Sequence, residues 1–165
     1  MAITTNLDGK VALVTGASSG IGRGVALALA ACGSHVFLNY PGPQEEHKAA
    51  EVLRTLRDSG GSGALVEGDV SDEAAVKGMF ERVLAHNGRL EILINNAGIA
   101  RSAPVQDITL DDWNAVFSVH MTGTLLCTRQ ALPTMFAQNA GRIIITASHL
   151  ACIGAPGFAH YTEGK

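Results

Sequence analysis

Residues 11–22 read VALVTGASSGIG, and this stretch decides the fold. It opens with a short apolar run and continues through a loop with three spaced glycines. The alanine- and leucine-rich segment 21–31 follows. That order is typical of a strand, a loop and a helix. Because Gly16, Gly20 and Gly22 have no side chains, backbone amides there can approach a pyrophosphate at the helix N-terminus. The alternative is a purely structural role, in which the same glycines form a tight strand-to-helix turn.

The alternation of strand and helix continues along the chain. Further apolar runs lie at residues 35–40, 63–67, 90–95 and 142–146, and helical segments lie at about 44–58, 72–87 and 110–138. The strands are continuous apolar runs, which are typical of a parallel sheet covered on both faces. The sequence therefore predicts a doubly wound, Rossmann-type α/β fold with three layers, in one domain over residues 1–165.

Composition excludes several classes of partner. The 165 residues carry a formal net charge of −3 and no basic block, so nucleic acid is not an expected ligand. Residues 1–8 lack the charged and apolar regions of a secretory signal, which favours the cytoplasm. The most apolar helical stretch, 116–136, contains His120, Arg129 and Pro133, so we expect no membrane span.

The sequence does not indicate a metal site or a disulfide framework. Cys32, Cys127 and Cys152 are odd in number and widely spaced, and the six histidines show no compact ligand spacing. We expect buried, reduced thiols and no bound metal.

The spacing of the glycines narrows the type of nucleotide site. A phosphate-binding P-loop needs Gly-Lys-Ser/Thr, but Arg23 follows Gly22. The pattern Gly-x-x-x-Gly-x-Gly also differs from the Gly-x-Gly-x-x-Gly of long-chain dehydrogenases. Residues 15–22 match the TGxxxGIG signature, and the chain here resembles the short-chain dehydrogenase/reductase family. The resemblance extends through Asp69-Val70, residues 95–98 and a Ser, Tyr, Lys set, in order, from about Gly9 to the last residue.

The resemblance implies a nicotinamide site and assigns residues to it. Asp69 would bond the adenine amine with Val70 beside the ring, and Asn95-Asn96-Ala97-Gly98 would form the floor beneath the cofactor. On local chemistry alone these are a helix-leading acidic turn and a turn-rich strand end. The predicted cofactor-binding set is Gly16, Ser18, Ser19, Gly20, Ile21, Gly22, Asn39, Tyr40, Asp69, Val70, Asn96, Ala97, Gly98, Tyr161 and Lys165.

The choice between the two nicotinamide cofactors depends on the end of the second predicted strand. NAD enzymes of this fold place an acidic residue about 20 positions beyond the glycines, and NADP enzymes place an arginine nearby. The strand ends Asn39-Tyr40-Pro41, where neither determinant is present. We expect NADP or NAD, with NADP favoured because this ending resembles that of many NADP-using reductases of the family.

The predicted catalytic set is Ser148, Tyr161, Lys165 and His120. A free tyrosine has a pKa of about 10, and a neighbouring ammonium stabilises its phenolate. Tyr161 and Lys165 are neighbours on one face if their segment is helical. The resemblance implies carbonyl reduction or its reverse, with Tyr161 exchanging the proton, Ser148 orienting the substrate oxygen and Lys165 holding the nicotinamide ribose. An isolated Tyr-x-x-x-Lys is most often an ordinary helix pair.

One position departs from the family pattern. The family has asparagine in the helix before the fifth strand, within Asn-x-x-Gly, and this chain reads His120-Met121-Thr122-Gly123. An imidazole can relay protons near its ordinary pKa of about 6.5. The alternatives are a proton relay through His120, a broken relay, and a histidine tolerated by packing. His149 and His160 flank the catalytic residues and are expected to line the substrate pocket.

The family resemblance predicts two further strands and a substrate loop beyond Lys165, so we expect the fifth strand to present an unpaired apolar edge. Three hypotheses follow: part of an active reductase, a truncated and inactive nucleotide-binding protein, or a sugar-nucleotide epimerase or dehydratase. The glycine spacing and residues 95–98 disfavour the third. The chain is similar to glucose dehydrogenases and acyl-carrier-protein ketoreductases alike. The expected partner is a small carbonyl or alcohol, and the full-length chain is expected to form a homo-oligomer.

Overall fold

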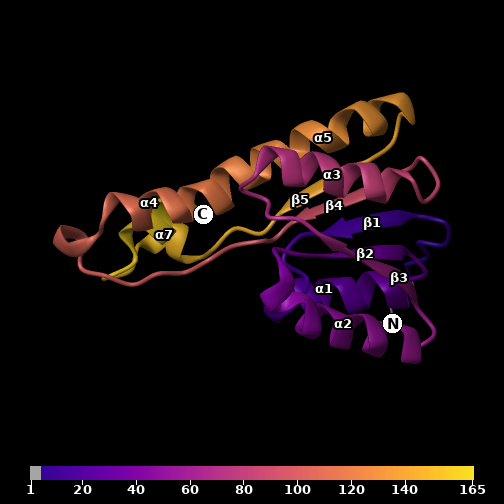
Figure 1. The fold of residues 1–165 in the computed structure, drawn as a ribbon, viewed down its shortest axis with the longest axis horizontal. Helices are drawn as coiled ribbons and strands as arrows, with labels where there is room; N and C mark the ends of the chain where they lie inside the picture. The colour runs from indigo at the N-terminus through magenta and orange to yellow at the C-terminus, as the bar shows by residue number, and fades with distance from the viewer. Residues whose placement is uncertain (1–4) are drawn as a thin grey trace.

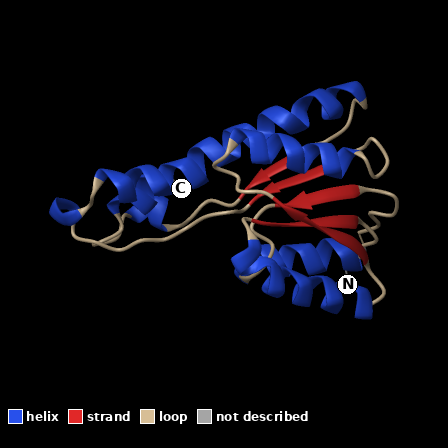
Figure 2. Cartoon of the chain, viewed as in Figure 1, coloured by secondary structure: helices blue, strands red, loops and turns tan. Residues whose placement is uncertain are grey.

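A computed structural model describes residues 5–165, so the interpretation of residues 1–8 falls partly outside it. Its centre is one parallel sheet in the order β3-β2-β1-β4-β5 (Figures 1 and 2). The strands are β1 (Val11–Val14), β2 (His35–Tyr40), β3 (Ser62–Glu67), β4 (Ile92–Asn95) and β5 (Arg142–Ile145). The predicted α/β fold is confirmed.

Helices cover both faces of the sheet, as Figure 1 shows. One layer holds α1 (Gly20–Ala31) and α2 (Pro43–Asp58); the other holds α3 (Glu73–Leu84) and α5 (Gly123–Ala137). The short helices are η1 (Val105–Asp107), α4 (Leu110–Phe117), η2 (Ser118–Thr122), α6 (Leu150–Ile153) and α7 (Ala159–Glu163). Asp72 and Thr109 cap α3 and α4 by accepting backbone N–H bonds.

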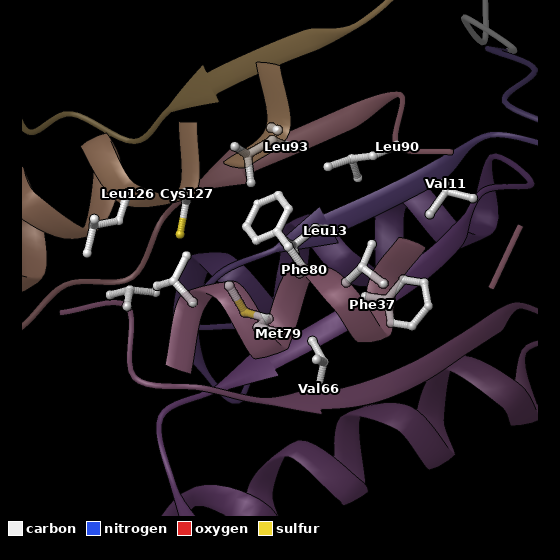
Figure 3. Packing of buried hydrophobic residues seen from close by; sticks show 14 of the residues in the cluster. Val11, Leu13, Phe37, Val66, Met79, Phe80, Leu90, Leu93, Leu126 and Cys127 are labelled. Atoms are coloured by element: carbon white, nitrogen blue, oxygen red, sulfur yellow. The ribbon is translucent and has the colours of Figure 1, made fainter. Parts of the chain in front are cut away.

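The strands are apolar on both faces because each face has its own core. In β1, Val11 and Leu13 face the cluster under α3 and α5, whereas Ala12 and Val14 face the cluster over α1 and α2. Figure 3 shows the first cluster, where Phe80 of α3 lies against the sheet. Side chains alternate between faces along a strand, so a run without polar residues is the pattern that two covered faces require.

The predicted helix over 110–138 is interrupted. It consists of α4, a π-helical turn at Ser118–Thr122 called η2, and α5. A π turn inserts one extra residue into a helix and shifts the face of everything after it. The elements predicted from the sequence do not include η1 or α6.

Two segments extend beyond the sheet and lie together. They are the connection from β4 to α4 and the connection from β5 to α7 (Figure 1). Ala103 N–H donates to the Gly157 carbonyl at 2.9 Å, and α7 packs against α4. These segments carry Tyr161 and Lys165 away from the two main cores.

The fifth strand has the exposed apolar edge that was expected. β5 is last in the sheet order, and Ile144 and Ile145 are 52% and 58% exposed. Within residues 5–165 no helix combines the length and the apolar character needed to cross a membrane. Across the same residues, no three His, Cys, Asp or Glu side chains converge to hold a metal ion.

Candidate active site

The candidate site lies where the strand order reverses. From β1 the chain passes to β2 on one side, whereas β4 lies on the other side. In doubly wound sheets, ligands bind at such a switch point, outside the carboxyl ends of the strands. The glycine loop follows β1 at this edge and residues 95–98 end β4 there.

The glycine loop is fastened to the end of β4. Thr15 Oγ1 accepts the N–H groups of Asn96 at 2.9 Å and Ala97 at 3.0 Å, and Asn96 Nδ2 donates to the Thr15 carbonyl at 2.9 Å. A Cβ at Gly16 would lie 2.9 Å from Ala97 Cα, and Gly16 has a φ of +62°. Close approach and left-handed backbone both require glycine there.

The start of α1 suits an anionic group. In the described chain, the side chain of the N-cap residue Ser19 makes no capping hydrogen bond. A Cβ at Gly20 would meet nothing within 4 Å among residues 5–165, and Gly20 has a φ of +53°. Ile21 is exposed and Gly22 is buried against the loop. Free amides at a helix N-terminus bind phosphate groups, so these residues fit a dinucleotide.

Glu45 is a residue of this site that sequence reasoning missed. Ser18 Oγ donates to Glu45 Oε2 at 3.0 Å, and Lys48 Nζ contacts Glu45 Oε1 at 2.8 Å. Hydrogen bonds from Lys48 and then Ser18 hold the pKa of Glu45 below its ordinary value. Glu45 lies in α2, beyond the strand end at which NAD enzymes carry their acidic residue, so the sequence pattern offered no signal for it.

Asn39 lies beneath the loop with its amide fully engaged. Its Oδ1 accepts Gly16 N–H at 3.2 Å, and its Nδ2 donates to the carbonyls of Val66 and Gly68 at 3.3 and 2.9 Å. Asn39 is 1% exposed, and the neighbouring Tyr40 is buried too. Burial raises the pKa of Tyr40 above its ordinary value. Asn39 therefore shapes the loop from below, and any contribution to cofactor binding would be indirect.

The Asp69-Val70 pair lies at the end of the connection from β3. Asp69 is exposed and accepts bonds from Ser71 N and Oγ at 2.9 and 2.7 Å. Val70 is buried against Gly123, where an added Cβ would lie 2.8 Å from Val70 Cγ2. The pair thus joins the turn before α3 to the start of α5.

Three of the four predicted catalytic residues are brought together. The rings of His120 and Tyr161 meet edge to face, with centroids 5.5 Å apart. A Cβ at Gly98 would lie 2.8 Å from His120 Cε1 and 3.2 Å from Lys165 Nζ. Lys165 Nζ donates to the Thr146 carbonyl at 3.1 Å, and burial lowers the pKa of Lys165. Gly98 is therefore the point on which the histidine and the lysine converge.

The helical pairing of Tyr161 with Lys165 stays a prediction. Helix α7 spans Ala159–Glu163, and Gly164 N–H donates to the His160 carbonyl at 3.2 Å, the spacing of a helical bond. Lys165 Nζ reaches the carbonyl end of β5 at Thr146.

Ser148 lies on a separate turn before α6. Its half-buried Oγ accepts Leu150 N–H at 3.2 Å. His149 is exposed beside it, whereas His160 is wholly buried. Neither ring nitrogen of His160 has a hydrogen-bond partner among residues 5–165. The expectation that His160 lines an open pocket is therefore wrong, because helix α7 lies with that side chain packed inward.

A cavity of about 380 Å³ lies beside His120 and Lys165. It is bounded by the ends of β4 and β5, by α5, and by His120 and Lys165. Polar groups on its wall include Asn95, whose Nδ2 donates to Thr128 Oγ1 at 3.1 Å. The site thus combines a loop at a helix N-terminus, a half-buried lysine and a phenol at one edge of the sheet.

Comparison with known proteins agrees with this arrangement. The family model for short chain dehydrogenases matches residues 10–165. A 3-oxoacyl-[acyl-carrier-protein] reductase of Synechocystis sp. is 39% identical over 98% of this chain and 64% of its own length. The reductase of that name from Staphylococcus aureus is 38% identical over 94% of this chain and 63% of its own length.

Similarity extends to a larger enzyme and to a solved structure. Peroxisomal multifunctional enzyme type 2 of Drosophila melanogaster is 39% identical over 96% of this chain and 27% of its own length. A Sinorhizobium meliloti crystal structure described as a short-chain alcohol dehydrogenase has a TM-score of 0.90 and 31% identity, over 97% of this chain and 62% of that one. The chain thus spans less than two thirds of these relatives. With the glycine loop, the Asn96 anchor and the tyrosine–lysine centre in family order, it belongs to the short-chain dehydrogenases.

Proposed function

We propose that the protein is an NAD(P)-dependent oxidoreductase that interconverts a carbonyl and a secondary alcohol. The observation that carries the proposal is the meeting of His120 and Lys165 beside Gly98, with Tyr161 against the His120 ring, at the edge where the glycine loop opens. Family membership and the names of the reductase relatives support the same reaction class.

Each residue has a distinct role in this proposal. A nicotinamide cofactor supplies hydride chemistry when bound over residues 96–98. Tyr161 gives a proton to the substrate oxygen in reduction and takes one in oxidation. Ser148 donates a hydrogen bond to that oxygen and orients it. Lys165, held by the Thr146 carbonyl, keeps a positive charge near the phenol and binds the ribose.

The cofactor would be held by the cradle at the start of α1, with Asp69 and Val70 on the adenine side. The ending Asn39-Tyr40 favours NADP, whereas the Glu45 carboxylate is the kind of group that favours the free 2′-hydroxyl of NAD. Lys48 partly offsets that carboxylate.

The competition between these groups gives a direct test of cofactor choice. The Glu45→Gln variant removes the negative charge and frees Lys48, so NADPH should bind about three- to tenfold more tightly relative to NADH. Fluorescence titration with both cofactors measures the ratio, and Glu51→Gln on the outer face of α2 is the matched control. An unchanged ratio would remove Glu45 from cofactor selection.

The expected substrate is a small carbonyl or alcohol, the compartment the cytoplasm, and the full-length chain a homo-oligomer. The test of the reaction is NAD(P)H oxidation by a panel of ketones and 3-oxoacyl thioesters, after the mass of the protein in solution is established. Tyr161→Phe should abolish turnover while leaving cofactor binding intact. Glu163→Gln, at an exposed position on the same helix, should not abolish turnover. Cofactor binding without turnover in the unaltered protein would favour the alternative, an inactive nucleotide-binding protein.

A further inference from the structure

His120 contacts both polar groups of one peptide unit with a single nitrogen. His120 Nε2 lies 3.0 Å from Ile99 N and 2.8 Å from the Ile99 carbonyl oxygen. His120 lies in the π turn η2, and Ile99 directly follows Gly98. The contact therefore joins the long helix to the segment that leaves β4.

One nitrogen of a neutral imidazole either donates or accepts a hydrogen bond. If Nε2 carries the proton, it donates to the Ile99 carbonyl; if it does not, it accepts the Ile99 N–H. Either tautomer leaves a favourable contact, so the neutral ring holds Ile99 in both. A protonated ring keeps the Nε2–H bond to the Ile99 carbonyl, but it also carries an N–H on the buried Nδ1, which has no acceptor among residues 5–165.

The same geometry makes His120 a poor carrier of protons. A relay takes a proton on one nitrogen and releases it from the other, but Nε2 faces a backbone amide, which does not pass protons on. Nδ1 is buried and has no hydrogen-bond partner among the residues from 5 to 165. The ring is thus anchored at one end and enclosed at the other.

What the ring holds is the centre of the site. A Cβ at Gly98 would lie 2.8 Å from His120 Cε1 and 3.2 Å from both His120 Nε2 and Lys165 Nζ. On the other side, the edge of the ring meets Tyr161. A shift of His120 would therefore move Gly98, Lys165 and Tyr161 together.

We propose that His120 is a positioning residue, which as a neutral imidazole clamps Ile99 to the long helix and so fixes Gly98, Lys165 and Tyr161, and that it does not carry protons in the reaction. This inference rests on the proposed function for its effect on turnover, whereas the clamp itself is a property of the fold.

The charges around the ring define its pH dependence. The titratable groups that face it are Lys165, at the end of α7, and the Tyr161 phenol on α7. The buried His160 precedes Tyr161 in α7, which packs against α4. Burial lowers the pKa of His120, the Ile99 carbonyl opposes this, and Lys165 lowers it further. The pKa of His120 lies below its ordinary 6.5, so the ring is neutral at neutral pH, and protonation at lower pH places a charged Nδ1–H, unpaired among the described residues, inside the site and displaces the ring.

Two substitutions separate clamping from proton transfer. The amide of His120→Asn can accept the Ile99 N–H and donate to its carbonyl at once, and it does not titrate. We expect this variant to keep kcat within about threefold of the unaltered protein and to lose the decline in kcat on the acid side. His120→Ala can make neither bond, and kcat should fall about 30- to 100-fold as the centre shifts.

Hydrogen exchange at the Ile99 amide gives a second reading that needs no turnover. His120→Ala should speed this exchange, and His120→Asn should restore its protection. If the kcat of His120→Asn is as low as that of His120→Ala while the Ile99 amide stays protected from exchange, the ring is a proton carrier and the proposal is wrong. Unchanged exchange and kcat in His120→Ala would equally overturn it. If His120→Ala does not fold, the kcat of His120→Asn at neutral pH, read together with the protection of its Ile99 amide, still decides between the two roles. Absence of turnover in the unaltered protein would remove the proposed function alone, because the exchange measurement tests the clamp separately.

Discussion

At the scale of single residues, the site depends on a glycine that has no side chain as much as on the side chains around it. Gly98 has no side chain, and the space that a Cβ would fill is occupied by His120 and Lys165. The imidazole is a rigid ring held by Ile99, so it cannot swing aside as a flexible chain end would. The identity of residue 98 is therefore tied to the position of Lys165.

This contact predicts the effect of adding one methyl group. Gly98→Ala should lower kcat about 100-fold, because a displacement near 1 Å of a catalytic group costs that much. The matched control is Gly78→Ala in α3, where a Cβ would meet nothing within 4 Å among residues 5–165. That change should raise the free energy of unfolding by about 0.5–1 kcal/mol, since alanine is the better helix former. Steady-state kinetics and urea unfolding check both, and wild-type turnover in Gly98→Ala would contradict the packing argument.

His35 gives the fold a pH dependence that is independent of the active site. Its ring stacks on His86 with centroids 4.0 Å apart, and Nδ1 lies 2.7 Å from Ser62 Oγ. Burial, then His86, then Arg57 lower the pKa of His35 from its ordinary 6.5. The unfolded chain thus binds more protons than the folded one between those two pKa values.

The sign of the effect follows from that difference. The free energy of unfolding should be constant at neutral pH, fall as the pH drops through about 6.5, and level off below the folded pKa. Urea unfolding across this range should show a smaller loss in His35→Gln. His47→Gln, on an exposed histidine of α2, should retain the full loss. Equal slopes in the two variants would assign the acid sensitivity to other groups.

At the scale of elements, Asn39 on β2 links the glycine loop after β1 to the backbone at the end of β3. It accepts a bond from the loop after β1 and donates to carbonyls at and beyond the end of β3. Asn39→Asp keeps the shape but turns a donor into a charged acceptor against those carbonyls. The free energy of unfolding should fall by about 3 kcal/mol.

The control for this substitution is Asn114→Asp, on the exposed face of α4. It should change the free energy of unfolding by less than about 0.5 kcal/mol. A small effect at Asn39 would mean that the glycine loop is held mainly by Asn96 and Thr15.

Local pattern predicted some elements fully and others in part. The strand expected at 35–40 is β2, because an apolar run between polar turns determines a doubly buried strand. The π turn at Ser118–Thr122 was not predicted, since the helical pattern continues through it and the extra residue accompanies the contact of His120 with Ile99. Glu45 was missed because its partner Ser18 is distant in sequence.

At the scale of the whole molecule, the sheet is unevenly covered. Strands β1, β2 and β4 are sealed between two cores, whereas β5 carries Ile144 and Ile145 more than half exposed at the edge. Unpaired backbone groups beside apolar side chains form a template for pairing with other chains. The 165-residue chain should therefore self-associate through β5 more readily than through its helical faces.

A charge at this edge tests the argument. Ile144→Lys should slow aggregation of the 165-residue chain, followed by light scattering, and change the free energy of unfolding by less than about 1 kcal/mol. Ile94 is its register partner on β4 and is 4% exposed, so Ile94→Ala should cost about 3 kcal/mol while Ile144→Ala costs far less. Equal costs at the two positions would mean that Ile144 is covered in solution. Unchanged aggregation in Ile144→Lys would place the self-associating surface elsewhere, with the exposed Leu125 and Phe136 of α5 the next to be substituted.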